Sequence, residues 1–331
     1  MTAAAHRPAT LEDVARVAGV SRSTASRVIA GTGFASPAAR ELVTAAVDQL
    51  GYVPNPAARA LVRGGGGGVR MVVAVLGTSA AVLDDPYVHR VVGSAARVCT
   101  AAGVGVALQW LPLGGSRSLD KLAEDRTVCG VILINTTEDL LDGVPRSLHG
   151  RVVSIGIGSA TVPSFDIDNA AGSDAVLRHL YATGRRRIAM VTGPRWLPCA
   201  QRPVQTYRRL MSQAGLPERV LPGDFTAARG RVAAGVALRQ WPDVDAIYSI
   251  SDDTALGVMA GLRDAGVRVP DDVAVAGFDD IPLAGLTAPA LTTASHPVGR
   301  IAAAAATALL DGRPSAPVTL FPSALVARAS A

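Results

Sequence analysis

The sequence contains few cysteines, few aromatic residues and no long apolar run. Its 331 residues include three cysteines, and aromatic residues make up 4% of the chain. The three are widely spaced (Cys99, Cys129 and Cys199), which excludes a disulfide framework and is typical of a reducing compartment. No apolar run reaches the roughly 18 residues that a membrane helix needs, and the N-terminal residues lack a secretory signal. We therefore expect a cytoplasmic protein with no membrane association and no cofactor.

Lysine is nearly absent, and arginine carries the positive charge. Lys121 is the single lysine among 32 basic residues, and the 27 acidic residues leave a formal net charge of +5. Residues 1–63 contribute +3 of this total. A basic excess in a short segment favours a polyanionic partner such as nucleic acid.

Five consecutive glycines, residues 64–68, separate a short N-terminal head from a long body. Such a run holds neither a helix nor a strand. In the body, short apolar runs alternate with amphipathic segments, which predicts parallel sheets covered by helices. Residues 69–331 are more than a single hydrophobic core usually accommodates, so we expect two α/β lobes. The predicted strands are Met71–Leu76, Gly105–Leu108, Val131–Ile134, Val152–Ile157, Ile188–Thr192, Ala246–Ile250 and Val273–Ala276.

The head, residues 1–63, is predicted to be all-α. Thr10 begins a Thr-x-x-Asp capping pattern ahead of an apolar stripe with helical spacing. Gly19 ends this first helix and Ser21 caps a second one. A third helix begins at a Ser-Pro pair and is expected to bury Leu42. Two short helices joined by a tight turn and braced by a third are typical of a helix-turn-helix unit.

The second helix carries polar side chains that suit DNA. Arg22 and Ser23 occupy its first exposed positions, where a recognition helix contacts base edges, and arginine binds guanine through two hydrogen bonds. Thr24, Ser26 and the helix N-terminus suit phosphate oxygens, and Arg27 reaches either a base or the backbone. An ordinary solvated helix face is the alternative. Their place on the second helix of a capped pair favours DNA binding.

A short segment before the glycines is predicted to form a hinge helix over about residues 55–63. Asn55 caps this helix, which is too short to be stable alone and should form when paired with a second copy on DNA. Leu61 protrudes from a surface of small residues, which suits insertion between base steps in the minor groove. A plain amphipathic linker remains the alternative.

Several long segments together resemble the lac repressor family of bacterial transcription regulators. ATLEDVARVAGVSRSTASRVIAG and SPAARELVTAAVDQLGYVPNPAARAL are similar to the head of that family, and FDIDNAAGSDAVLRHLYATGRRRIAMVTG follows its body. The resemblance implies a homodimer, a palindromic DNA operator, and a body like a periplasmic binding protein with two doubly wound lobes. Pattern and resemblance together predict DNA contacts from Thr10, Ser21, Arg22, Ser23, Thr24, Ser26, Arg27, Tyr52, Asn55, Ala58, Arg59 and Leu61.

The resemblance also implies a small-molecule effector, a sugar or a nucleoside or purine, in a cleft between the lobes. By analogy, the first lobe takes about residues 69–161 and 295–320, and the second takes about 162–294 and 321–331. The implied effector contacts are Tyr87, Asp168, Arg202, Phe225, Ser251 and Asp279. Helix or turn caps remain alternative roles for Asp168 and Asp279. The pairs Asp84–Asp85 and Asp252–Asp253 are interpreted as turn and cap residues, and the five histidines show no metal-ligand spacing.

We therefore expect a sequence-specific DNA-binding regulator, and specifically a repressor whose operator affinity depends on the effector. A regulator with a degenerate effector site is the alternative. An enzyme is disfavoured because the sequence contains no Gly-Lys-Ser/Thr phosphate loop and no Gly-x-Ser-x-Gly elbow. A solute-binding protein would carry an export signal and no helical head.

Overall fold

The computed structural model describes residues 11–30, 35–50, 70–114, 117–312 and 317–331. The chain divides into two compact units, a head of residues 1–69 and a body of residues 70–331. The predicted hinge helix and the glycine linker, together with Thr10, lie outside the described residues.

Three helices with a shared apolar core form the head: α1 (Leu11–Val17), α2 (Arg22–Ala30) and α3 (Pro37–Leu50). Val14, Ala25 and Val43, one from each helix, are fully buried. Gly19 follows α1 with a φ of 65°, the left-handed conformation that ends a helix and turns the chain towards α2. The predicted helix-turn-helix unit is therefore confirmed. The prediction that Leu42 is buried is wrong: this side chain is 54% exposed, because its neighbour Val43 fills the core-facing position.

The first lobe of the body contains a six-stranded parallel sheet in the order β11-β5-β4-β3-β1-β2. Its strands are β1 (Arg70–Gly77), β2 (Gly105–Pro112), β3 (Val128–Ile134), β4 (Val152–Ile155), β5 (Ser164–Ile167) and β11 (Val318–Phe321). Successive side chains of β1 enter different cores: Val73 packs on one face and Val72 on the other. This burial on both faces explains why the sequence of β1 is an unbroken apolar run.

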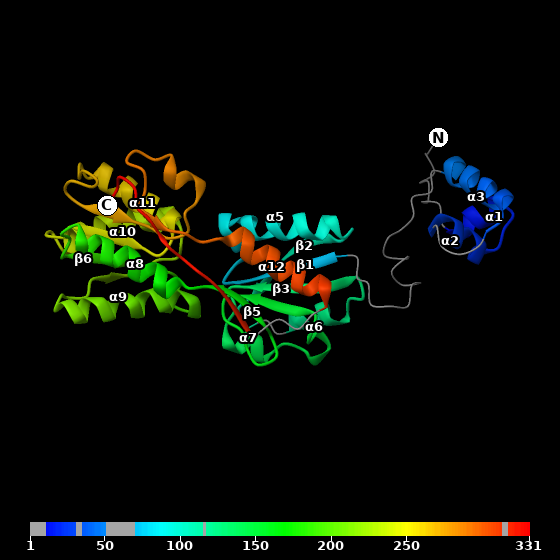
Figure 1. The fold of residues 1–331 in the computed structure, drawn as a ribbon, viewed down its shortest axis with the longest axis horizontal. Helices are drawn as coiled ribbons and strands as arrows, with labels where there is room; N and C mark the ends of the chain where they lie inside the picture. The colour runs from blue at the N-terminus through cyan, green and yellow to red at the C-terminus, as the bar shows by residue number, and fades with distance from the viewer. Residues whose placement is uncertain (1–10, 31–34, 51–69, 115–116, 313–316) are drawn as a thin grey trace, which may run out of the picture. The chain divides into compact units, whose positions relative to one another are not determined.

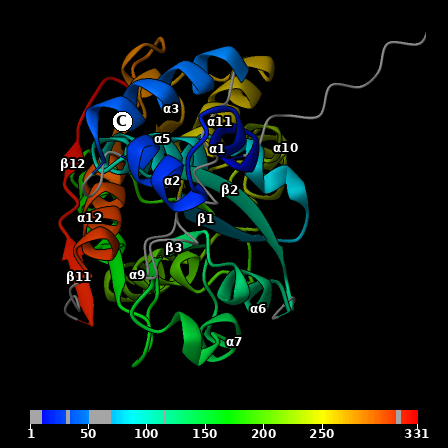
Figure 2. The same ribbon diagram turned by 90° about the vertical axis from the view of Figure 1, so that its right-hand side faces the viewer.

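Helices cover both faces of this sheet (Figures 1 and 2). On one face lie α5 (Pro86–Ala101) and α12 (Val298–Asp311), which also contact each other. On the other lie α6 (Arg117–Glu124) and α7 (Glu138–Asp142), which contribute Leu119 and Leu140 to the second core. Two short 3₁₀ helices, η1 (Ala80–Asp84) and η2 (Arg146–Leu148), complete the connections of this lobe.

The second lobe repeats the arrangement with a smaller parallel sheet in the order β7-β6-β8-β9. Its strands are β6 (Ile188–Val191), β7 (Val220–Leu221), β8 (Ala246–Ser249) and β9 (Ala274–Ala276). Its helices are α8 (Asn169–Ala182), α9 (Gln201–Ala214), α10 (Ala227–Gln240) and α11 (Asp252–Asp264), with η3 (Pro198–Ala200) and η4 (Pro282–Gly285) between them. All seven predicted strands are present, and the doubly wound fold is confirmed.

The chain passes between the lobes at three places: after β5, between β10 (Thr293–Ala294) and α12, and between β11 and β12 (Leu325–Val326). β10 and β12 pair antiparallel to each other. The structure places the first passage after Ile167, later than the predicted boundary near residue 161, because β5 hydrogen-bonds to both β4 and β11. The sequence did not predict β5, since it is four residues long and contains a charged residue, Asp166.

Helices α10 and α11 approach each other so closely that their backbones touch. A Cβ atom on Gly230 would lie 2.0 Å from the Thr254 carbonyl oxygen, and one on Gly257 would lie 1.9 Å from the Ala227 carbonyl oxygen. Neither backbone can move without shifting a whole helix, so both positions require glycine.

We expect Gly257→Ala to lower the free energy of unfolding of the body by about 1–3 kcal/mol, because the added methyl group forces the two helices apart. Urea unfolding followed by circular dichroism measures the change. Gly93→Ala in α5 is the matched control: its Cβ would meet only the Arg97 guanidinium at 3.9 Å. This control should be neutral or raise stability by up to about 1 kcal/mol, since alanine favours the helix. Equal effects of the two substitutions would contradict the packing argument.

Candidate effector cleft and DNA-recognition helix

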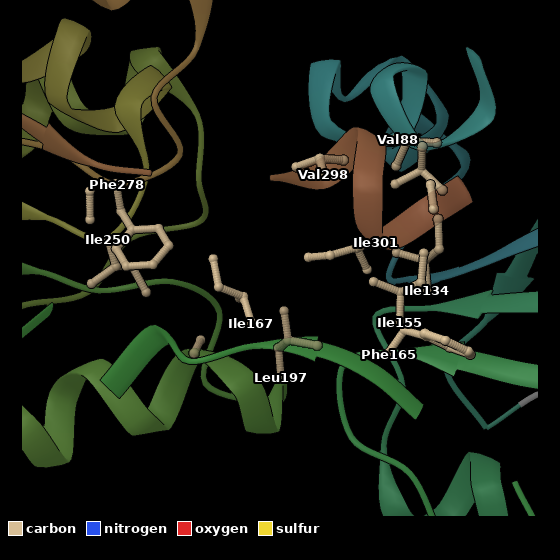
Figure 3. Packing of buried hydrophobic residues seen from close by; sticks show 14 of the residues in the cluster. Val88, Ile134, Ile155, Phe165, Ile167, Leu197, Ile250, Phe278, Val298 and Ile301 are labelled. Carbon is tan, nitrogen blue, oxygen red and sulfur yellow. The ribbon is translucent and has the colours of Figure 1, made fainter. Parts of the chain in front are cut away.

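A cavity of about 130 Å³ lies between the two lobes of the body. Its walls are the segments that directly follow strands: Asn135 follows β3, Gly156 follows β4, Ser251 comes after β8, and Phe278 comes after β9. Both sheets are parallel, so the carboxyl ends of their strands meet at this cleft, where such folds place ligands. Apolar side chains form part of the wall, with Phe278 and Ile250 on one side and Ile155 and Ile301 on the other (Figure 3).

Four carboxylates line the cavity: Asp85, Asp166, Asp253 and Asp279. Burial raises the pKa of Asp85, and the nearby charges of Asp279 and Asp253 add to the shift, against the hydrogen bond donated by Tyr87 N. Burial and then Asp279 raise the pKa of Asp253 as well. Burial, the first cause of both shifts, disfavours the charged carboxylates, and the neighbouring carboxylates add to this effect. A ligand that donates hydrogen bonds to these side chains would stabilise their charged forms.

His296 connects the lobes at one side of the cavity. It lies in the segment that passes from β10 to α12, and its Nδ1 is 2.8 Å from Asp279 Oδ1. Its ring centroid is 5.5 Å from that of Tyr87 in the first lobe and 6.1 Å from that of Phe278 in the second. With 11% of its side chain exposed, His296 is held on three sides, and the cavity lies on the remaining one.

Asp252 is a fully buried carboxylate directly behind the cavity. Its Oδ2 accepts a hydrogen bond from Ile281 N at 2.9 Å, and its Oδ1 accepts one from Thr293 Oγ1 at 2.6 Å. Burial, followed by the charge of Asp279, raises the pKa of Asp252 to about 8. This side chain therefore ties α11 to β10, the strand that precedes a lobe crossing.

The structure brings four of the six predicted effector residues together: Tyr87, Phe225, Ser251 and Asp279 line the cavity. The two others occupy neighbouring positions. Asp168 caps α8, because its Oδ1 accepts a hydrogen bond from Ala171 N at 2.9 Å. Arg202 reaches the cavity wall through its ion pair with Asp166, whose side chain is 6% exposed. Asp166 lines the cavity, whereas the sequence predicted this role for Asp168 and Arg202.

Sequence reasoning missed several cavity residues, notably Asp85, Asn135, Asp166, Asp253 and His296. The sequence predicts a turn or cap role for Asp85, and this residue does cap α5, since its Oδ1 accepts a hydrogen bond from Tyr87 N at 2.8 Å. It also lines the cavity, so one residue serves both roles. The signal that was available for Asn135 was its position immediately after a buried parallel strand.

The second helix of the head presents the predicted polar side chains. Ser21 caps α2, since its Oγ accepts a hydrogen bond from Thr24 N at 3.1 Å. Arg22, Ser23 and Arg27 are exposed, whereas Thr24 and Ser26 are half-buried. Arg27 Nε donates to the Ser23 carbonyl at 3.1 Å. Arg22 lies 3.6 Å from Glu12 with both side chains well exposed, an arrangement that holds the arginine weakly and leaves it available.

The predicted contacts Tyr52, Asn55, Ala58, Arg59 and Leu61 lie outside the described residues, as does Thr10. Within the residues that are described, no cluster of three or more His, Cys, Asp or Glu side chains is arranged to hold a metal ion. Over the same ranges, none of the helices combines the length and the apolarity that crossing a bilayer requires.

Comparison with known proteins identifies both units. Residues 10–55 match the family described as "Bacterial regulatory proteins, lacI family", and residues 177–331 match "Periplasmic binding protein-like domain". The chain is 36% identical to the HTH-type transcriptional regulator CelR of Thermobifida fusca. This alignment of 337 residues covers 95% of this chain and 95% of the relative. The chain is 31% identical to the HTH-type transcriptional regulator MalR of Streptomyces coelicolor over 323 residues, which cover 91% of this chain and 89% of the relative.

Solved structures agree with this assignment. A structure described as "transcriptional regulator CelR-cellobiose complex" shares 33% identity with a TM-score of 0.68 and covers 98% of this chain and 100% of that one. The lac repressor dimer bound to operator and the anti-inducer ONPF has a TM-score of 0.82 at 24% identity, covers 98% and 99%, and shows the shared fold. The fold and these relatives define a bacterial DNA-binding transcription regulator, not an enzyme. The chain belongs to the lacI family, which confirms the resemblance in its sequence.

We expect the stability of the body to fall as the pH rises from about 4 to about 8, because of Asp252. Its folded pKa of about 8 lies above the ordinary value of 3.8, so across this interval the native state keeps a proton that the unfolded chain has lost. The raised pKa values of Asp85 and Asp253 act in the same direction. The urea midpoint should therefore be higher at pH 5 than at pH 8.

Asp252→Asn should reduce this pH dependence, because the amide is neutral at every pH. Asp311→Asn, which removes an exposed carboxylate at the end of α12, is the control for loss of charge alone. A midpoint that is independent of pH in the parent chain, or a slope unchanged by Asp252→Asn, would show that Asp252 titrates normally.

Proposed function

We propose that the chain is a repressor that binds a palindromic operator as a homodimer and changes its DNA affinity when a carbohydrate binds in the cleft. The observation that supports this most directly is the chemistry of the cavity. Carboxylates from both lobes, with Asp85 in the first and Asp253 in the second, stand beside aromatic rings. Sugar hydroxyls donate to carboxylates, and the apolar face of a pyranose stacks on a ring.

The relatives support a carbohydrate more than a nucleoside or purine. The CelR structure that shares 33% identity with this chain was solved as a complex with cellobiose. We carry this chemistry over because the cavity of this chain offers acceptors for hydroxyl groups. Asp166, which accepts from Arg202 and from Ile167 N, is a preorganised member of that set.

Coupling to DNA would follow from the three lobe crossings. A ligand held by both lobes stabilises the arrangement in which they are closed. Its effect on DNA affinity is limited by the difference between its affinities for the two arrangements. In the homodimer, the two copies of α2 would occupy successive major grooves. Hinge helices from residues of about 55–63 would meet in the minor groove between them.

Arg22→Ala should weaken operator binding by about ten- to a hundredfold for each half-site, since a bidentate arginine–guanine contact contributes about 1–3 kcal/mol and the dimer makes two of them. The operator is first selected from random duplexes with the purified chain, and affinity is measured by fluorescence anisotropy at fixed salt. Arg16→Ala is the matched control: it removes the same charge from an exposed arginine of α1 that pairs with Asp13 at 2.7 Å. Equal losses in both variants would indicate only a general electrostatic contribution from Arg22.

Cellobiose, maltose and other neutral sugars that bind in the cleft should raise the melting temperature of the body, by an amount that grows with the ratio of sugar concentration to Kd. Asp279→Asn should weaken this binding about tenfold or more, because it removes a cavity acceptor that also positions His296. Asp264→Asn is the control, because it changes an ion-paired carboxylate at the end of α11 that does not line the cavity. Operator binding with no response to any sugar would favour a regulator whose effector site is degenerate.

A further inference from the structure

A second hollow, an outer groove of about 580 Å³, adjoins the inner cavity. Five residues line both spaces: Asp85, Asn135, Leu197, Phe225 and Asp253. The two are therefore neighbouring compartments of one elongated cleft. A ligand that enters the inner cavity lies against the same side chains that form the wall of the outer groove.

The sizes of the two compartments differ in a way that bears on the ligand. A cavity of about 150 Å³ holds one benzene molecule, so the inner cavity, at about 130 Å³, has room for one ring at most. The outer groove falls within the range of about 300–1,000 Å³ that is usual for ligand sites. It has room for a further ring attached to the first.

Phe225 marks the junction between the compartments and is fixed there by the backbone. Its φ of 72° is a left-handed conformation that a residue with a bulky side chain rarely adopts. A Cβ on Gly193 would lie 2.5 Å from Phe225 Cζ, so the ring occupies space that only glycine leaves open. Such strained residues gather at ligand sites, where the surrounding structure maintains them.

The outer groove combines an aromatic surface with acceptors. Trp196, which follows β6, is half-buried, lines the groove, and packs against two apolar clusters, one of which belongs to the first lobe. The carboxylates of Asp84 and Asp224 add to those shared with the inner cavity. Of the described residues that line the groove, none is basic. The groove therefore suits a neutral molecule with many hydroxyl groups and an apolar ring face, and it disfavours a phosphate.

We propose that the effector is a neutral chain of at least two sugar rings, with one ring in the inner cavity and the next in the outer groove against Trp196. The proposal rests on the carbohydrate function proposed above and adds a second subsite to it. Asp85 and Asp253, one from each lobe, stand where the two rings join. The link between rings therefore lies where the lobes approach each other.

Two series of sugars test this on the full chain: glucose, cellobiose and cellotriose, and glucose, maltose and maltotriose. Isothermal titration calorimetry gives each affinity. In one of the series, the two-ring sugar should bind at least about tenfold more tightly than glucose, as expected for an added aromatic contact with hydrogen bonds. Glucose 6-phosphate should bind no better than glucose.

Trp196→Ala should remove most of the gain from the second ring and leave glucose binding within about twofold. Trp196→Phe keeps a flat ring and should retain most of the gain, which separates the ring contact from a general loss of stability. Affinity that is equal for one and two rings, or an equal loss for both in Trp196→Ala, overturns the second subsite and leaves the carbohydrate function standing. Binding of no sugar in either series overturns both proposals.

Discussion

The parallel pairing of strands within each lobe is the constraint on which the cleft depends. Every strand of a parallel sheet ends at the same edge, so the residues that follow β3, β4, β8 and β9 come together although they are far apart in sequence. The three crossings hold these two edges opposite each other. Polar side chains at the ends of apolar strands thereby become the walls of one cavity.

This arrangement places several carboxylates close together in and behind a partly buried cleft, which costs stability. Asp85, Asp252 and Asp253 each have a raised pKa because burial disfavours their charged forms and neighbouring carboxylates add repulsion. A sequence selected for stability alone would replace them with neutral residues. Their presence is consistent with a fold that gives up stability for a site able to accept hydrogen bonds.

Most of the fold was predictable because burial on both faces produces apolar runs such as the one in β1. The exceptions are short or contain charge: β5 contains Asp166, and its strand character depends on pairing with β11, more than 150 residues later. The site was predictable only in part. Tyr87 and Asp279 were identified through resemblance. His296 was missed because only the folding of the chain brings it close to these two residues, which are distant from it in sequence. Asp85 shows a further limit, because a capping residue and a cavity residue have the same appearance in sequence.

The order of segments in the first sheet has a consequence for synthesis of the chain. β11, at one edge of that sheet, and α12, which covers a face of it, are formed by residues 298–321. β1 to β5 are therefore synthesised together with α5, α6 and α7 long before α12 completes the cover of one face and β11 completes the edge, whereas the second lobe is built from one nearly continuous stretch. The first lobe therefore stays incomplete until the last part of the chain has been translated. Dependence on chaperones would be concentrated in the N-terminal half of the body.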